Sequence, residues 1–208
     1  MANRTSFTTD TGQSSDKIEV SLVVPAERSG LFATGRSAER RLADYDNCLF
    51  DPGRGLLIRT LWYFLSLVLL ESGWFPISSI KTRVLRLFGA RIGSGLVIHP
   101  NVRIKYPWRL TVGDNCWIGR EVWIDNLADV TLESDVCLSQ GAYLCTGSHD
   151  HRSATFELKT GEIRILHGAW ICCRAVVLGD SIVPRLHVVP AGDVFRSPSV
   201  DMVRRKPR

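Results

Sequence analysis

The amino-acid sequence predicts an all-β solenoid, in which short parallel strands wind around one axis, preceded by a helical element. Three observations lead to this fold class. An apolar residue recurs every six positions from Ile92 onward, the residue two places earlier is usually apolar as well, and every break in the period follows a third repeat. A helix of about 3.6 residues per turn cannot hold a six-residue phase, so we assign the repeat to strands.

Two positions in each repeat define the predicted interior of the coil, because alternate side chains of a strand share one face. The recurring positions are Ile92, Ile98, Ile104, Val112, Ile118, Ile124, Leu132, Leu138, Leu144, Ile165, Ile171, Val177, Val183, Val189 and Phe195. The residues two places before the first twelve are Ala90, Leu96, Val102, Leu110, Cys116, Val122, Val130, Val136, Ala142, Ile163, Ala169 and Ala175. After Val177 these positions become polar, which predicts an atypical terminal turn.

The breaks in the period predict where the coil carries extra residues. Two residues are inserted after Ile104, two after Ile124 and fifteen after Leu144. If three repeats make one turn, all three insertions fall at the same corner, where a solenoid tolerates them because they project outward. We therefore expect a β-helix over residues 90–195 with an outward loop at 145–162, whose sequence is free to serve something other than the core.

The residues before the coil predict a helical cap over 41–89. The segment Leu56–Leu70 is almost wholly apolar but shorter than the ~20 residues that span a bilayer. It is expected either to be buried on the coil or a neighbouring subunit, or to lie in a membrane interface as a peripheral contact. The next segment reads as an amphipathic helix that is capped by Ser78 or Ser79 and stops at Gly89.

Composition narrows the class of protein. Residues 1–40 are polar and expected to be disordered, residues 196–208 form a basic tail, and the net charge of +5 is too modest to predict a nucleic-acid partner. The six cysteines have neither a CxxC pair nor zinc-finger spacing, and the N-terminus has no apolar signal segment. These features predict a cytoplasmic protein, with the inner face of the plasma membrane as the possible contact of Leu56–Leu70.

Several motifs resemble those of the hexapeptide-repeat acyltransferases, and most narrowly the colanic-acid-biosynthesis acetyltransferases, which are relatives of maltose and galactoside O-acetyltransferases. The motifs are YDNCLFDPGR, LFGARIG, KYPWRLTVGDNCWIG, VWIDNLADVTL, SQGAYLCTGSHD and GAWICCRAVV, between about residues 45 and 192. The resemblance implies a left-handed coil, a homotrimer with active sites between subunits, and acetyl transfer from acetyl-CoA to a sugar hydroxyl, without a metal.

The resemblance also assigns roles to individual residues. His149, in TGSHD, matches the catalytic loop, and an imidazole suits a general base because its ordinary pKa is near about 6.5. Asp125 and Asn126 match an acceptor-binding region. Asp and Asn also favour turns, so the pair equally fits a purely structural role, in which their side chains hydrogen-bond the backbone of their own corner. Trp170, Cys173, Ala191 and Gly192 match positions along CoA, and Arg196 is a further candidate for its phosphates.

One departure from the family keeps other functions open. The family's AGNPA-like segment is missing, since the chain instead reads GDVFRSPSVDMVRRKPR. A catalytically impaired scaffold or regulatory subunit therefore remains the alternative to the acetyltransferase. A metal hydro-lyase of the γ-carbonic-anhydrase kind would need His149, His151 and His167 to converge on one ion.

Overall fold

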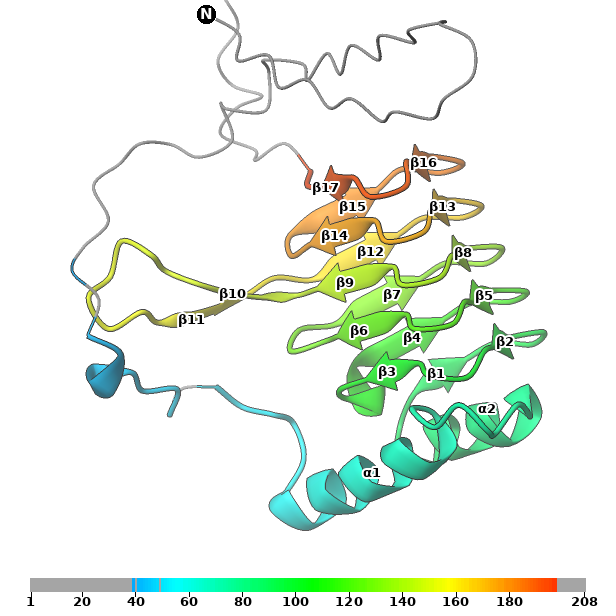
Figure 1. Cartoon of the computed structure of the whole chain (residues 1–208), viewed down its shortest axis with the longest axis horizontal. Helices are drawn as coiled ribbons and strands as arrows, with labels where there is room; N and C mark the ends of the chain where they lie inside the picture. Colours follow the sequence, from blue (N-terminus) through cyan, green and yellow to red (C-terminus); the bar gives the residue numbers. More distant parts are fainter. Residues whose placement is uncertain (1–38, 40, 49, 198–208) are drawn as a thin grey trace, which may run out of the picture. The chain divides into compact units, whose positions relative to one another are not determined.

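The computed structural model describes residues 39, 41–48 and 50–197. Most of the segment expected to be disordered, 1–40, and of the basic tail, 196–208, lies outside these residues. The described chain begins with a short 3-10 helix, η2 (Leu42–Asp44), followed by the helices α1 (Leu56–Leu69) and α2 (Ser78–Leu87) and then by strands (Figure 1).

The strands form a parallel β-solenoid of five turns, with one strand of each turn in each of three sheets (Figure 1). The first sheet contains β1 (Arg91–Ile92), β4 (Leu110–Val112), β7 (Val130–Leu132), β12 (Ile163–Ile165) and β15 (Ser181–Val183). The second contains β2 (Val97–Ile98), β5 (Trp117–Ile118), β8 (Cys137–Leu138), β13 (Trp170–Ile171) and β16 (Val188–Val189). The third contains β3 (Arg103–Ile104), β6 (Trp123–Asp125), β9 (Tyr143–Cys145), β14 (Val176–Leu178) and β17 (Val194–Phe195). The predicted solenoid is confirmed.

The six-residue repeat fills the interior as predicted. All fifteen recurring positions are buried except Ile92 and Phe195, which are half-buried at the two ends of the coil, and the twelve earlier positions are buried too. Each buried aliphatic side chain contributes roughly 1.5–3 kcal/mol through removal of its surface from water. The terminal turn is complete, because β15, β16 and β17 each pair with a strand of the turn before. Its inward residue Ser181 is polar but accepts a hydrogen bond from the Ser197 amide.

The three corners of the coil differ. The corners between the first and second sheets and between the second and third sheets each place one residue per turn at positive φ. The third corner, called here the insertion corner, consists of residues 105–109, 126–129, 146–162 and 179–180, and it holds all the predicted insertions. The fifteen-residue insertion is a β-hairpin of β10 (Gly147–His149) and β11 (Leu158–Thr160), which projects from the coil (Figure 1).

The helix α2 covers the first turn and corrects one prediction. Ser78 is the first helical residue rather than the cap, and its hydroxyl instead bonds both the amide and the carbonyl of Ile98 in β2. The stop at Gly89 is confirmed, with φ +98°. Lys81 is fully buried and donates to the His99 carbonyl at 3.0 Å. Burial lowers the pKa of this amine, because desolvation disfavours its charged form.

The helix α1 is mostly exposed. Only Trp62 and Ser66 are buried, with the indole of Trp62 donating to the Ile104 carbonyl. The expectation that the coil of this chain buries the segment Leu56–Leu70 is therefore wrong for most of its side chains. No helix in the described ranges is long and apolar enough to cross a membrane.

Candidate active site

The hairpin of the insertion corner carries His149 at the end of β10. His149 pairs with Leu158 of β11 in the antiparallel register. Because β10 leaves the coil and β11 returns to it, the coil holds both arms of the hairpin. The return to the coil passes through Gly161, where an added Cβ would lie 2.6 Å from the Asp180 amide nitrogen. Glycine is needed there because no side chain fits, and this close approach anchors the hairpin against the next turn.

The imidazole of His149 is half-buried and held in one orientation. Its ring stacks on Phe156, with centroids 4.3 Å apart and planes within 2°, and meets the edge of Tyr45 at 5.5 Å. Nδ1 lies 2.8 Å from the Phe156 carbonyl oxygen. Because a carbonyl oxygen can only accept, Nδ1 of the neutral ring carries the proton and Nε2 keeps its lone pair. The arrangement is suited to a group that takes up a proton through Nε2.

The residue that orients His149 is Phe156, and sequence reasoning missed it. Phe156 has φ +52°, an unfavourable left-handed conformation for a residue with a bulky side chain. The group that contacts His149 is the backbone carbonyl of Phe156, and since every residue has a backbone carbonyl, the sequence gives no signal for this role. Tyr45 was also missed as a contact of His149, although it opens the motif YDNCLFDPGR.

The acidic neighbour of His149 has a different partner. Asp150 forms an ion pair with Lys159 at 2.7 Å and accepts a bond from the Arg152 amide. The Lys159 ammonium and this amide lower the pKa of the Asp150 carboxyl. Asp150 therefore fastens the two arms of the hairpin together and does not orient the base.

A cavity of about 310 Å³ lies beside His149. Its walls are both arms of the hairpin, the end of β14 at Leu178, the corner residues Gly179 and Asp180, and Arg196 after β17. Of the predicted CoA residues, Arg196 is thus the one that shares a cavity with His149. His151 also lines this cavity but is exposed, and no ring contact joins it to His149 among the described residues.

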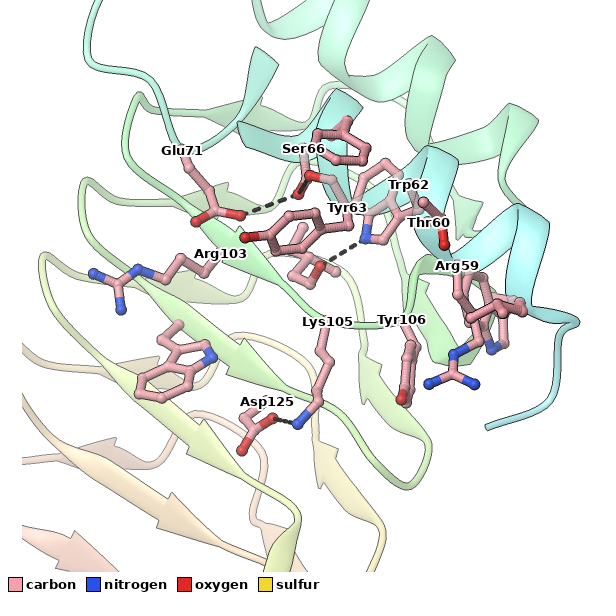
Figure 2. A pocket seen from close by; sticks show the side chains of 15 residues that line it. Arg59, Thr60, Trp62, Tyr63, Ser66, Glu71, Arg103, Lys105, Tyr106 and Asp125 are labelled. Atoms are coloured by element: carbon pink, nitrogen blue, oxygen red, sulfur yellow. Dashed lines mark hydrogen bonds and ion pairs between the residues drawn. The ribbon is translucent and has the colours of Figure 1, made fainter. Parts of the chain in front are cut away.

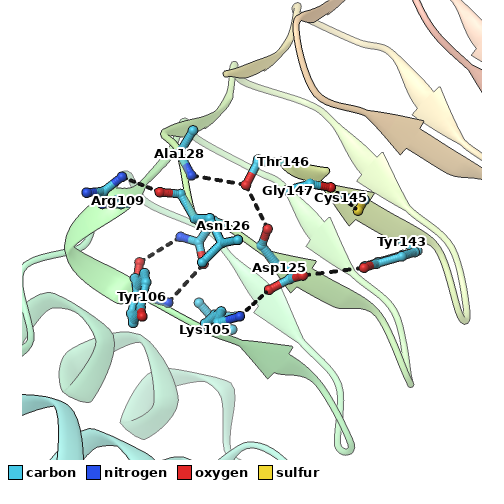
Figure 3. Close-up of polar contacts among 12 residues, drawn as sticks. Lys105, Tyr106, Arg109, Asp125, Asn126, Ala128, Tyr143, Cys145, Thr146 and Gly147 are labelled. Atoms are coloured by element: carbon cyan, nitrogen blue, oxygen red, sulfur yellow. Dashed lines mark hydrogen bonds and ion pairs between the residues drawn. The ribbon is translucent and has the colours of Figure 1, made fainter. Parts of the chain in front are cut away.

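The two predicted acceptor residues behave differently (Figure 3). Asn126 is fully buried, donating from Nδ2 to the Tyr106 carbonyl at 2.6 Å and accepting from the Tyr106 amide at 2.9 Å. This geometry matches the alternative reading, in which the residue holds its own corner. Asn126 is therefore left out of the acceptor site proposed below.

Asp125 has its carboxylate on the outer face of the third sheet and about one-seventh exposed. Lys105 lies 3.1 Å from Oδ1 as an ion pair, in a geometry that does not make a hydrogen bond, and the Tyr143 hydroxyl donates to Oδ2 at 3.4 Å (Figure 3). Oδ1 is thus a buried oxygen with an unused acceptor position. Asp125 lines a second groove, beside α1, and that groove is adjacent to the His149 cavity.

Comparison with known proteins places the chain in a family. It is 37% identical over 163 residues to WcaF of Escherichia coli K12, a protein assigned to colanic acid biosynthesis as an acetyltransferase, and the match covers 75% of this chain and 86% of WcaF. The chain belongs to the WcaF acetyltransferase family. A WcaF of Shigella flexneri matches with the same identity and the same coverage.

The fold of this WcaF-family chain also has a solved counterpart. A hexapeptide-repeat-containing acetyltransferase from Vibrio cholerae O1 biovar eltor, crystallised with acetyl-coenzyme A, superposes with a TM-score of 0.61 at 20% identity. The superposition covers 71% of this chain and 81% of that one, and it establishes the shared solenoid. No family model matches the sequence.

The remaining candidate CoA residues of this WcaF-family chain lie away from its own His149. Trp170 points outward from β13, half-exposed, with its indole donating to the Ser139 hydroxyl at 2.8 Å. Cys173, Ala191 and Gly192 are exposed at the corner between the second and third sheets, where the Gly192 amide bonds the Cys173 carbonyl one turn earlier. None of these four residues lines the cavity beside the His149 of the same chain.

A metal site has no ligand set in the part of the chain that the structure describes. No group of three or more His, Cys, Asp or Glu side chains there is arranged to hold an ion. His167 lies at the corner between the first and second sheets, with Nδ1 3.4 Å from Asp135, whereas His149 and His151 belong to the hairpin. The three histidines considered for a hydro-lyase therefore do not converge.

Proposed function

We propose that this chain is an acetyl-CoA-dependent O-acetyltransferase that acetylates a sugar hydroxyl, with His149 as its general base. The observation that carries the proposal is the hydrogen bond from Nδ1 of His149 to the Phe156 carbonyl. It leaves the Nε2 lone pair available beside a cavity, on a hairpin that the coil and the Asp150–Lys159 pair hold in place.

The proposed reaction needs one group that accepts and then returns a proton. Nε2 of His149 takes the proton of the sugar hydroxyl while the hydroxyl oxygen forms a bond to the carbonyl carbon of the thioester. The tetrahedral intermediate then expels the CoA thiolate, and the imidazolium returns the proton to that sulfur. The products are an O-acetyl sugar and free CoA, and the Phe156 carbonyl stabilises the imidazolium by accepting from Nδ1 throughout.

Support for the two substrates comes from the relatives. WcaF is assigned to the biosynthesis of colanic acid, an exopolysaccharide, and the Vibrio cholerae structure holds acetyl-coenzyme A. A sugar acceptor of exopolysaccharide biosynthesis, and acetyl-CoA as donor, are therefore the substrates that we propose. Asp125, whose carboxylate lies on the outer face of the third sheet and is 14% exposed, is the proposed partner of an acceptor hydroxyl.

We further propose a homotrimer in which CoA binds between two subunits. The support is the separation of Trp170, Cys173, Ala191 and Gly192 from the His149 of the same chain, since a second copy is needed to bring the two sets together. Mixing inactive His149→Ala subunits with Gly192→Trp subunits, in which the indole blocks the CoA path, is expected to restore part of the activity. Mixed oligomers that stay inactive would contradict a shared site.

We propose a cytoplasmic location, where acetyl-CoA is available, with α1 in contact with the inner face of the plasma membrane. The exposure of the apolar side chains of α1 supports this contact. Fractionation of cells that express the full chain is the corresponding measurement.

The proposed activity is tested by acetyl transfer from acetyl-CoA to a panel of oligosaccharides. His149→Ala is expected to lower kcat by about 10²–10⁴-fold. His151→Ala, in the same hairpin, is the matched control and is expected to leave kcat unchanged. Equal loss in both variants would point to a damaged hairpin rather than to a missing base.

Calorimetry with acetyl-CoA separates this proposal from the scaffold. Wild-type and His149→Ala proteins are expected to bind acetyl-CoA with similar affinity, because His149 acts on the acceptor. If neither protein binds acetyl-CoA, the missing AGNPA-like segment has removed the cofactor site, and the non-catalytic scaffold becomes the better account.

A further inference from the structure

The helix α1 presents an apolar stripe that nothing in the described part of the chain covers. Leu57, Leu61, Phe64 and Val68 follow one another at helical spacing on one face, and their side chains are 83%, 57%, 61% and 51% exposed. The buried residues Trp62 and Ser66 lie on the opposite face. Leaving four large apolar side chains in water is unfavourable, so this stripe is expected to have a partner.

The charges around the stripe indicate the chemistry of that partner. Apart from the buried Lys81, residues 52–92 contain the cations Arg54, Arg59, Arg83, Arg86 and Arg91, and Glu71 is the single acid. Trp74, 69% exposed, follows α1. An apolar stripe with basic neighbours and a flanking tryptophan is the pattern of a helix that lies in the surface of an anionic bilayer.

Next to the stripe, α1 and the third sheet enclose a groove of about 530 Å³, called here the α1 groove (Figure 2). The residues that line it include Arg59 and Arg103 and the aromatic residues Tyr63, Tyr106 and Trp123. Arg103 lies over the Trp123 ring, 5.4 Å from its centroid. Aromatic walls with a few fixed polar groups are typical of sites for small molecules, and aromatic faces suit sugar rings.

The α1 groove has a surplus of positive charge. Of its two acids, Asp125 is paired with Lys105, and Glu71 accepts a hydrogen bond from the Ser66 hydroxyl at 3.0 Å (Figure 2). In the ranges that the structure describes, neither Arg59 nor Arg103 lies within ion-pair distance of a carboxylate. Two guanidinium groups without an acidic partner in a partly enclosed groove favour an anion, and guanidinium binds phosphate with two hydrogen bonds.

The α1 groove also lies one strand away from the proposed active site on the outer face of the third sheet. Asp125 at its edge is the register partner of Cys145, which lines the His149 cavity, and neighbouring strands are about 4.8 Å apart. A single extended molecule on the outer face of the third sheet can therefore reach both.

We propose that the α1 groove binds the phosphorylated end of a lipid-linked sugar acceptor, while the stripe on α1 lies on the anionic bilayer that holds its lipid. The proposal rests on the proposed function and names its acceptor class. Arg59 and Arg103, which lie on opposite sides of the groove in Figure 2, are two separate contacts for the phosphorylated end. The aromatic walls hold the adjoining sugar, and a hydroxyl further along the saccharide reaches His149. The acceptor is thus presented at a membrane surface, and a free neutral oligosaccharide lacks the phosphate and membrane contacts.

The groove is tested by kinetics with two acceptors that share one saccharide, one linked to polyprenyl diphosphate in vesicles and one free and neutral. Arg59→Gln and Arg103→Gln are expected to raise KM for the lipid-linked acceptor by about 10-fold or more relative to KM for the neutral acceptor, through loss of charged hydrogen bonds. Arg164→Gln, an exposed guanidinium on the first sheet, is the matched control. The saccharide 1-phosphate is a third acceptor. If it gains as much from the two arginines as the lipid-linked form does, phosphate alone is recognised and the lipid-linked class is overturned.

The stripe is tested by sedimentation of the full chain with vesicles. Binding is expected to an equal mixture of phosphatidylcholine and phosphatidylglycerol, and to be lost in Leu57→Ser/Leu61→Ser, whose residues lie outside the groove. No binding to these vesicles by the wild type would overturn the membrane contact. A lower oligomeric mass of the double variant would overturn it as well, because the stripe would then be a contact between copies. His149→Ala is expected to keep vesicle binding, so a failure of this proposal is distinguishable from a failure of the base.

Discussion

Two of the three corners of the coil repeat one backbone conformation in every turn, whereas the insertion corner never repeats. The residues at positive φ are Gly95, Asn115, Asp135, Gly168 and Leu186 at one regular corner, and Asn101, Glu121, Gly141, Arg174 and Gly192 at the other. The insertion corner carries a 3-10 helix (η3, Pro107–Arg109), a short loop and a hairpin in successive turns.

The contrast shows where this fold separates stability from chemistry. At the regular corners each residue supports the residue one turn away, so a change there disturbs stacking. At the insertion corner the outward chain does not take part in stacking between turns. The proposed base, the carbonyl that orients it and the proposed acceptor residue all lie at or next to this corner. The same corner still needs internal support, which the buried side chains of Asn126 and Thr146 supply.

The largest effect is expected from removing the hairpin. Replacing residues 148–159 with Asn-Gly, a tight hairpin turn, deletes His149 and the Phe156 carbonyl but keeps Gly147 and Thr160 paired. Acetyl transfer is expected to disappear, while the far-ultraviolet circular dichroism and cooperative unfolding of the coil persist. An unfolded product would mean that the insertion belongs to the core, and the contrast between corners would fail.

Removal of the internal support of the insertion corner is expected to have the next largest effect. Asn126→Leu leaves the buried Tyr106 amide without its partner and removes one of the two bonds to the Tyr106 carbonyl, which still accepts from the Arg109 amide. The free energy of unfolding is expected to fall by about 1–3 kcal/mol. Gln140→Leu, at an exposed position of a regular corner, is the control and is expected to change it by less than about 0.5 kcal/mol. Chemical denaturation measures both, and equal effects would contradict a buried supporting role.

A regular corner is expected to respond to its backbone conformation. Gly141 has φ +67°, and Gly141→Ala is expected to lower the free energy of unfolding by about 1–2 kcal/mol, because an alanine is strained there. Gly55→Ala is the comparison, since Gly55 precedes α1 with φ −63° and open space around it. A neutral Gly141→Ala would show that the regular corners are not conformationally restricted.

The smallest effect concerns pH. The Ser94 amide and hydroxyl both donate to Asp114 at a regular corner, and these bonds lower the pKa of its carboxyl. A carboxyl whose folded pKa is below its unfolded value stabilises the fold above that unfolded value, about 3.9, and loses the contribution as the pH falls further. Asp114→Asn is expected to flatten the acid limb of the unfolding profile and to leave the slope unchanged above pH ~5. An unfolding profile identical to that of the wild type would contradict a contribution of these hydrogen bonds to stability.

The sequence was sufficient to predict the regular part of the molecule. The six-residue phase specified the inward positions, because burial selects apolar side chains one by one, and the breaks in phase located the insertion corner. It predicted less where the partner is backbone or depends on distant packing. The Phe156 carbonyl has no sequence signal, and Ser78 bonds β2 because the first turn of the coil lies against the start of α2.

The exposure of α1 could not be predicted for a related reason. An apolar segment of this length is compatible with burial on the coil, on a second copy or on a membrane, and only the position of α1 against the third sheet shows which side chains are covered. The groove beside it was missed because its residues come from α1, β3 and β6, and no short motif joins them.

The central claim is that the insertion corner holds His149 with a proton on Nδ1 and a free lone pair on Nε2. Nitrogen-15 NMR of histidine-labelled protein, assigned with His149→Ala, measures this directly at a pH where the ring is neutral. The account predicts an Nδ1–H tautomer for His149, with Nε2 unprotonated. An Nε2–H tautomer would contradict it, since the nitrogen assigned to proton uptake would already carry a proton and the Phe156 bond could not exist.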